Sequence, residues 1–71
     1  MYSMAYIGHR CRKYRRKILK TDLKTVASDL GYSPENISSF EHGRNDNSII
    51  LLWYMSHGMT IEQVLGDDLI E

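Results

Sequence analysis

The chain has 71 residues, with nine basic and nine acidic side chains that give a formal net charge of zero. This length predicts a single domain over residues 1–71 with a small core. The longest apolar run, IILLWYM, is far shorter than the ~20 residues of a membrane-spanning helix, so no membrane partner is expected. The opening stretch, MYSMAYIGHR, lacks the apolar segment of a secretory signal, and we therefore expect a cytoplasmic protein.

Residues that could carry catalysis or hold a metal are sparse. Cys11 is the only cysteine, which excludes an internal disulfide and a cysteine-rich metal site. His9, His42 and His57 lie far apart and lack the spacing of metal ligands. The sequence has no paired carboxylates, no nucleophile–base set and no phosphate-cradling glycine loop. We expect neither an enzyme nor a bound metal or cofactor.

The charges are unevenly distributed along the chain. Eight of the nine Lys and Arg residues lie in residues 10–24, and eight of the nine Asp and Glu residues lie in residues 29–71. This asymmetry indicates an anionic partner for the basic segment. A face that is simply solvated is the plainer interpretation.

The first expected helix covers residues 7–19, after an N-terminal arm of residues 1–6 that could be extended. Its apolar residues recur with the 3.6-residue period of one helix face, and the remaining positions from His9 to Lys17 are all basic. The apolar stripe consists of Ile7, Cys11, Tyr14 and Ile18. The place of Cys11 in this stripe predicts a buried, inert thiol.

Two short helices, residues 23–30 and residues 34–42, are expected next. Thr21 or Asp22 can cap the first, and Ser33 can cap the second with Pro34 in its first position. Gly31 ends the first helix because glycine readily adopts a positive φ, and Gly43 ends the second. The residues expected to point inward are Val26, Ala27, Leu30, Ile37, Phe40 and Glu41.

The last two expected helices are residues 49–57 and residues 61–65. Ser48 can cap the fourth helix, which is apolar nearly all round, and Gly58 ends it. Thr60 and Gln63 match a capping box for the fifth helix, which residues 66–71 follow as a tail. No segment alternates long enough to predict a strand, so the expected fold is all-α with five short helices.

The break between the second and third helices has the pattern of a helix-turn-helix unit. Two helices joined by a turn of about three residues containing glycine define this unit. Ala27 is small where the helices would cross most closely, and Ile37 would fill the angle between them. Gly31 supplies the positive φ of the turn.

At spacings of four and six residues, Ala27, Gly31 and Ile37 resemble the helix-turn-helix of the lambda-repressor-like (Cro/XRE-type) DNA-binding family. Three longer stretches are also similar: IGHRCRKYR to the first helix, ISSFEHGR to the end of the recognition helix, and SIILLWYMSHGMTIEQVL to the closing helix pair. The resemblance implies a compact five-helix DNA-binding domain and a small repressor of phage or mobile-element type, nucleoid-associated when bound to DNA. Leu23 is a departure, because the family often carries a phosphate-contacting Gln there.

The third helix would be the recognition helix, whose N-terminal residues such proteins place against base edges. With Ile37 inward, the outward positions are polar. Asn can pair bidentately with adenine, and Glu can accept from cytosine. The predicted base contacts are Glu35, Asn36, Ser38 and Ser39. Glu35 also suits the positive end of the helix, and Ser33 is assigned as a cap.

The resemblance implies that Arg15 and Glu41 form an ion pair between the first and third helices. Arg15 could also touch DNA, since Arg can bridge a carboxylate and a phosphate. Other basic and polar residues flank the recognition helix and would fix the register of the protein on DNA. The predicted phosphate contacts are Arg15, Arg16, Lys17, Lys20, Lys24, His42, Arg44 and Asn45.

The fourth helix is too apolar to be buried entirely within a chain of this length, so an exposed strip would suit a homodimer. The predicted interface residues are Trp53, Ile61, Leu65, Leu69 and Ile70. A dimer would hold two recognition helices ~34 Å apart, one turn of DNA.

Two functions follow. The first is a sequence-specific dimeric regulator of double-stranded DNA, most simply a repressor. The second is a protein-interaction module on the same fold, such as an anti-repressor or a cofactor that binds another regulator. The regulator is the preferred function. The alternative is motivated by a recognition helix that lacks Lys and Arg, and by Glu35 and Asp46, which stand near its DNA face.

Overall fold

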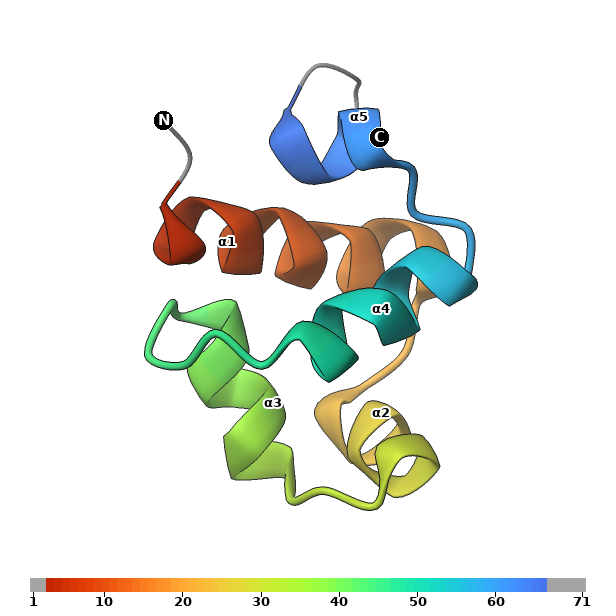
Figure 1. Ribbon diagram of the computed structural model, residues 1–71. Coiled ribbons are helices and arrows are strands. Elements are labelled where there is room, and N and C mark those ends of the chain that lie inside the picture. Colours follow the sequence, from red (N-terminus) through yellow and green to blue (C-terminus); the bar gives the residue numbers. More distant parts are fainter. Residues whose placement is uncertain (1–2, 67–71) are drawn as a thin grey trace.

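A computed structural model describes residues 3–66, which contain helices and no strand (Figure 1). The elements are α1 (Met4–Tyr14), the π-helical turn η1 (Arg15–Leu19), α2 (Leu23–Leu30), α3 (Pro34–Glu41), α4 (Ser48–Ser56) and α5 (Ile61–Leu65). The expected all-α fold with five α-helices is confirmed for these residues. The predicted tail lies outside the described residues beyond Gly66.

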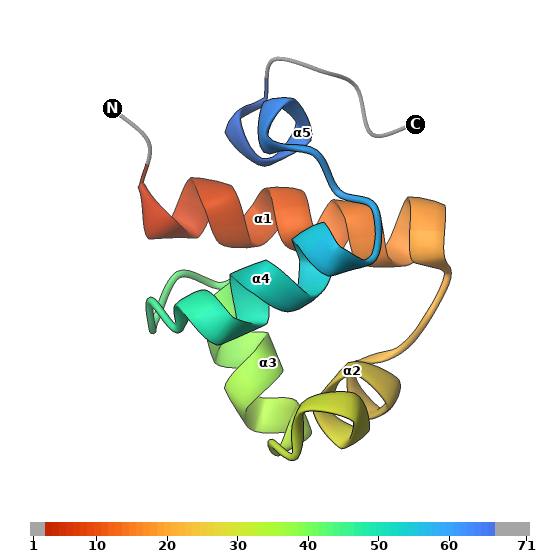
Figure 2. The ribbon, with the colours of Figure 1, turned by 45° about the vertical axis from the view of Figure 1, so that its right-hand side comes forward.

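The rod formed by α1 and η1 organises the other helices (Figures 1 and 2). α5 lies along one side of the rod, α2 and α3 lie on the opposite side, and α4 packs on a third side between them. Of these helices, α3 and α5 make the most extensive contacts with α1, and α2 packs on α3. The remaining side of the rod carries exposed residues, among them His9, Arg16 and Lys17.

The N-terminal end of α1 differs from the expectation. The helix begins at Met4 because the Ser3 side chain accepts a hydrogen bond from the Tyr6 N–H and caps the first turn. The predicted arm over residues 1–6 is therefore wrong for residues 4–6, which are helical rather than extended.

The π-helical turn shifts the inward face at the end of the first helix. The Lys20 N–H bonds back five residues to the Arg15 carbonyl, so this turn holds more residues than an α-helical one. As a result Leu19 packs against the core, whereas Ile18, expected in the apolar stripe, is 42% exposed. The stripe is confirmed for Cys11 and Tyr14, which are buried.

Most helix boundaries follow the caps that the sequence predicts. The side chains that accept first-turn N–H groups as expected are Asp22 in α2, Ser33 in α3 and Thr60 in α5, the last in a capping box with Gln63. The α4 cap is Asn47, whose side chain accepts the Ile49 N–H, and this helix therefore begins at Ser48, which was the predicted cap.

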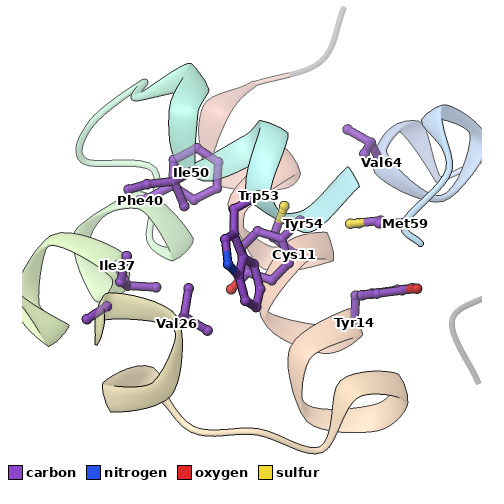
Figure 3. Packing of buried hydrophobic residues seen from close by; sticks show 11 residues of the cluster. Cys11, Tyr14, Val26, Ile37, Phe40, Ile50, Trp53, Tyr54, Met59 and Val64 are labelled. Carbon is purple, nitrogen blue, oxygen red and sulfur yellow. The ribbon is translucent and has the colours of Figure 1, made fainter. Parts of the chain in front are cut away.

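The core lies where α1, α3 and α4 meet, with contributions from α2 and α5 (Figure 3). Its largest fully buried side chains are Tyr54, Phe40, Ile37, Ile50, Met59, Val26, Val64 and Cys11. The expected inward residues of α2 and α3 are buried except Leu30, which is half-buried and packs against this cluster. Each large apolar side chain buried here contributes about 1.5–3 kcal/mol.

Burial sets the chemistry of Cys11, as predicted. The thiol is fully buried, and burial, with a smaller contribution from the negative charge of Glu41, raises its pKa from the ordinary 9.0 to about 12. The thiolate is the reactive form of cysteine, so the folded protein keeps this group unreactive at neutral pH.

We expect the free energy of unfolding to fall between about pH 9 and pH 12, because the unfolded chain releases the Cys11 proton there while the folded protein retains it. The slope from this group is about −1.4 kcal/mol per pH unit. Urea unfolding at several pH values measures it. The Cys11→Ala variant should be less stable at pH 7 but lose less stability over this range; an unchanged slope would contradict the shifted pKa.

α1 and α3 approach each other closely at Gly8. A Cβ atom there would lie 2.3 Å from the Phe40 carbonyl oxygen and 2.7 Å from the Glu41 carbonyl oxygen. Both are backbone atoms, so α3 itself would have to move. Glycine inside a helix costs roughly 0.5–1 kcal/mol relative to alanine, and the close approach explains why Gly8 is nevertheless present.

We expect Gly8→Ala to lower the free energy of unfolding by roughly 1–3 kcal/mol, since overpacking outweighs the gain in helix propensity. Urea denaturation followed by circular dichroism measures the change. Gly31→Asn is the matched control, because nothing lies within 4 Å of the added Cβ and Asn tolerates its φ of 74°. Equal losses in the two variants would show that contact with α3 is not what excludes a side chain at Gly8.

Candidate nucleic-acid interface

The corner between α2 and α3 is built from Gly31, Tyr32 and Ser33. Gly31 takes the left-handed conformation, and the Tyr32 N–H donates to the Ala27 carbonyl at 2.9 Å, which closes the last turn of α2. Ser33 then caps α3 directly. The corner sets α3 across α2, and the two helices pack against each other (Figures 1 and 2).

α3 has a buried side and a polar outer edge. Ile37, Phe40 and Glu41 are buried, and they fix the side that faces the core. The polar residues at the other positions differ in exposure. Glu35, Asn36 and His42 are exposed, whereas Ser38 and Ser39 are half-buried. The four predicted base contacts therefore lie on the accessible side, with Glu35 and Asn36 the most open.

Two of the predicted contacts bond within the protein. The His42 Nδ1 lies 2.8 Å from the Ser38 carbonyl oxygen, which holds the ring against the last turn of α3. The Asn45 Nδ2 donates to the Asn36 carbonyl at 3.3 Å, and its Oδ1 accepts the Asn47 N–H at 3.1 Å. Asn45 thus holds the loop after α3 in place, and we assign it this positioning role.

Arg15 and Glu41 form the predicted ion pair. Arg15 Nε donates to Glu41 Oε2 at 2.8 Å and Nη2 donates to Oε1 at 3.1 Å, which is a bidentate contact. The remaining Arg15 Nη1 donates to the Thr21 carbonyl at 2.9 Å. The hydrogen bond to Glu41 raises the pKa of Arg15, so the guanidinium stays charged. Since Arg15 is only 7% exposed, we withdraw it from the phosphate contacts.

Tyr54 completes this cluster and was not foreseen. Its hydroxyl donates to Glu41 Oε2, and the residue is fully buried in α4. Burial, reinforced by the negative charge of Glu41, raises the pKa of Tyr54 well above its usual range, so the phenol remains a donor. A buried tyrosine hydroxyl usually has a hydrogen-bond partner. This rule could have linked Tyr54 to Glu41, the carboxylate that the sequence predicted to point inward.

The other predicted phosphate contacts lie on three different segments of the chain. Arg16 and Lys17 are exposed on η1, Lys20 and Lys24 stand on either side of the start of α2, and Arg44 follows α3. The N-terminus of α2 is capped by Asp22, whose Oδ1 accepts both the Thr25 N–H and the Thr25 hydroxyl. The exposed side chains of Lys20 and Lys24 are the cationic groups available to an anion on this side.

The predicted dimer interface is wrong at Trp53. This residue is only 9% exposed and belongs to the core, with His57 stacked on its ring at 3.9 Å between centroids. Leu65 is half-buried against the core, Ile61 is 48% exposed, and Leu69 and Ile70 lie outside the described residues. The exposed apolar residues of α4 are instead Ile49 and Leu52, at 53% and 60%. Their three-residue spacing opposite the buried side could have identified them.

No family model, curated protein or solved structure matches this chain. None of the described helices is both long and apolar enough to cross a membrane. Among residues 3–66, no three side chains of the metal-binding types gather in one place.

We expect Arg15→Met to lower the free energy of unfolding by roughly 3–5 kcal/mol, because it leaves the Glu41 carboxylate buried without its cation. The Glu41→Gln variant should also be destabilised, and the double variant should lose less than the sum of the two single losses. Urea unfolding at pH 7 provides all four values. Arg16→Met is the matched control, since the neighbouring Arg16 is exposed and should change stability by no more than about 0.5 kcal/mol. Additive losses would contradict direct coupling.

Proposed function

We propose that this protein is a sequence-specific regulator that binds double-stranded DNA, with α2, the turn and α3 as the helix-turn-helix of a lambda-repressor-like domain. The observation that carries the proposal is the corner at Gly31. There a short helix is fixed at its C-terminal end by a buried ion pair while its polar edge stays open. A helix mounted in this way can enter the major groove with its N-terminal residues foremost.

Base recognition is assigned to the N-terminal half of α3. Asn36 can make two hydrogen bonds to adenine, and Glu35 can accept from the amino group of cytosine. Both side chains are exposed in the first turn of the helix. Ser38 and Ser39 are less exposed and would contact bases that approach α3 closely.

Phosphate contacts are assigned to the exposed cations beside this edge. Lys20 and Lys24 stand at the start of α2, and Arg44 stands in the loop after α3. Contacts of this kind supply affinity and register without reading sequence.

The regulator would act as a homodimer that occupies a two-fold site and represses transcription there. The exposed residues Ile49 and Leu52 lie about one turn apart on α4 and form an apolar strip that another copy could cover. A two-fold dimer would place its two α3 helices on half-sites one turn of DNA apart.

A protein-interaction module on the same fold is the second candidate. It is favoured by the absence of Lys and Arg from α3 and by the exposed carboxylates of Glu35 and Asp46, which would repel phosphates. Such an edge would instead suit a basic surface of another regulator.

Selection of bound duplexes from a random pool tests the proposal, since a regulator should enrich a two-fold sequence. Asn36→Ala should then lose roughly 10–100-fold in discrimination at one base pair, because a bidentate base contact is worth about 1–3 kcal/mol. Lys24→Ala should weaken binding to all sequences alike and reduce its salt dependence. Binding isotherms on the selected site and on single-base variants of it measure both effects.

Glu62→Ala is the control, since Glu62 is exposed on α5, across α1 from α3 (Figure 1). It should leave affinity and sequence preference unchanged. If no sequence is enriched, DNA recognition is contradicted and the protein-interaction module takes its place. If Lys24→Ala changes the preferred bases, its assignment as a phosphate contact is wrong.

A further inference from the structure

The solvent-facing side of α1 and η1 carries an open hollow of about 450 Å³. Every side chain that lines it is basic: His9, Arg12, Lys13, Arg16 and Lys17. We call this surface the α1 groove. In the sequence no acidic residue precedes Asp22, so the helix that forms the groove contains no anion of its own.

The Lys and Arg side chains of the groove repel one another electrostatically unless an anion lies against them. The spacing of four residues forms two rows, one with Arg12 and Arg16 and the other with His9, Lys13 and Lys17, with members of a row about 6 Å apart along the axis. Like charges at this spacing repel each other. In the continuous rod of α1 and η1, the helix dipole favours cations in the last turn, at Arg16 and Lys17, which leaves Arg12 and Lys13 with less of that benefit.

The cations that stabilise the fold lie on other sides of the rod. Arg10 Nε donates to the Gln63 carbonyl at 2.8 Å, and Arg15 is bound to Glu41. Within residues 3–66, by contrast, Arg12, Arg16 and Lys17 have no hydrogen-bond or ion-pair partner. These three guanidinium and ammonium groups are therefore available to an anionic ligand.

We propose that the α1 groove binds the phosphate backbone of duplex DNA without reading its bases. The lining contains no apolar side chain and, apart from the imidazole of His9, no aromatic ring. A docked acidic helix would need apolar anchors, and single-stranded nucleic acid would need aromatic stacking partners. An anionic membrane would need the apolar face of α1, which is buried in the core. Duplex DNA presents a dense array of phosphates that cations alone can hold.

The groove also lies away from the base-reading end of α3. The C-terminal end of α3 abuts α1 at Gly8, so Asn36 and Glu35 lie about 6–9 Å farther out along the helix. Contacts in the groove thus add to binding independently of the bases. This inference goes beyond the proposed function, because it requires no recognition of sequence.

The test measures binding of the full chain to random-sequence duplexes of about 30 base pairs, by fluorescence anisotropy from about 50 to 200 mM salt. Arg12→Gln/Arg16→Gln should lower affinity roughly 10–100-fold and reduce the slope of log affinity against log salt by about 1.8, which is two phosphate contacts. Arg12→Lys/Arg16→Lys keeps both charges and should retain the affinity and the slope. Urea unfolding verifies that every variant is folded.

A second control separates the position of the charge from net charge. Ser48→Glu/Ile61→Glu lowers the net charge by the same two units at exposed sites on α4 and α5, and should weaken binding much less. The proposal is overturned if the glutamine variant binds like the original protein, or if the glutamate control loses as much. It is also overturned if the glutamine variant loses affinity equally for polyglutamate or for vesicles of anionic lipid.

Failure of the groove proposal and failure of the proposed function give different results. If no sequence is enriched but the glutamine variant loses the salt-dependent binding, the groove stands without the regulator. If a sequence is enriched and the glutamine variant binds random duplexes unchanged, the regulator stands without the groove.

Discussion

The buried contact between Arg15 and Glu41 determines whether the outer edge of α3 has a fixed direction. Buried charges are costly unless they are paired and hydrogen-bonded, and here both partners are fully engaged. Arg15 comes from η1, Glu41 ends α3, and Tyr54 joins them from α4. Within residues 3–66 no buried side-chain polar atom lacks a partner. The orientation of α3 is thus tied to two other elements by directional bonds as well as by apolar packing.

The π-helical turn belongs to the same arrangement. Arg15 begins this turn, and its carbonyl accepts the N–H groups of Lys20 and Thr21 while its side chain donates to the Thr21 carbonyl. Arg15 therefore connects three places by hydrogen bonds: the end of η1, the segment that leads to α2, and the end of α3. Departures from α-helical geometry often occur where function constrains the chain, and this one places the cation that orients α3.

Local signals in the sequence were enough for most of the fold. Caps such as Asp22 and Ser33, and the left-handed glycine at position 31, act within a few residues, so their effects could be predicted. The partner of Tyr54 and the contact at Gly8 depend on atoms far away in the chain, which no local pattern contains. The exposure of Ile18 followed from the π turn, and that turn has no simple sequence signature. In the candidate site, the outward side of α3 could be predicted from the helical period of its apolar residues. The burial of Arg15 could not, because it depends on how the helices pack.

The division of charge between two helices explains how a chain without net charge could bind a polyanion. α3 carries the groups suited to base edges but no Lys or Arg, whereas Arg12, Arg16 and Lys17, which have no partner within residues 3–66, lie on α1 and η1. At physiological salt, interactions between exposed charges are weakened strongly over about 8 Å, and Glu35 stands about that far along α3 from the contact of α3 with Gly8. Its repulsion of phosphate therefore stays local to α3, and the attraction of the α1 groove is not cancelled by the acidic half of the chain. Affinity and recognition can then be supplied by separate elements, which the Arg15–Glu41 contact holds in one rigid unit.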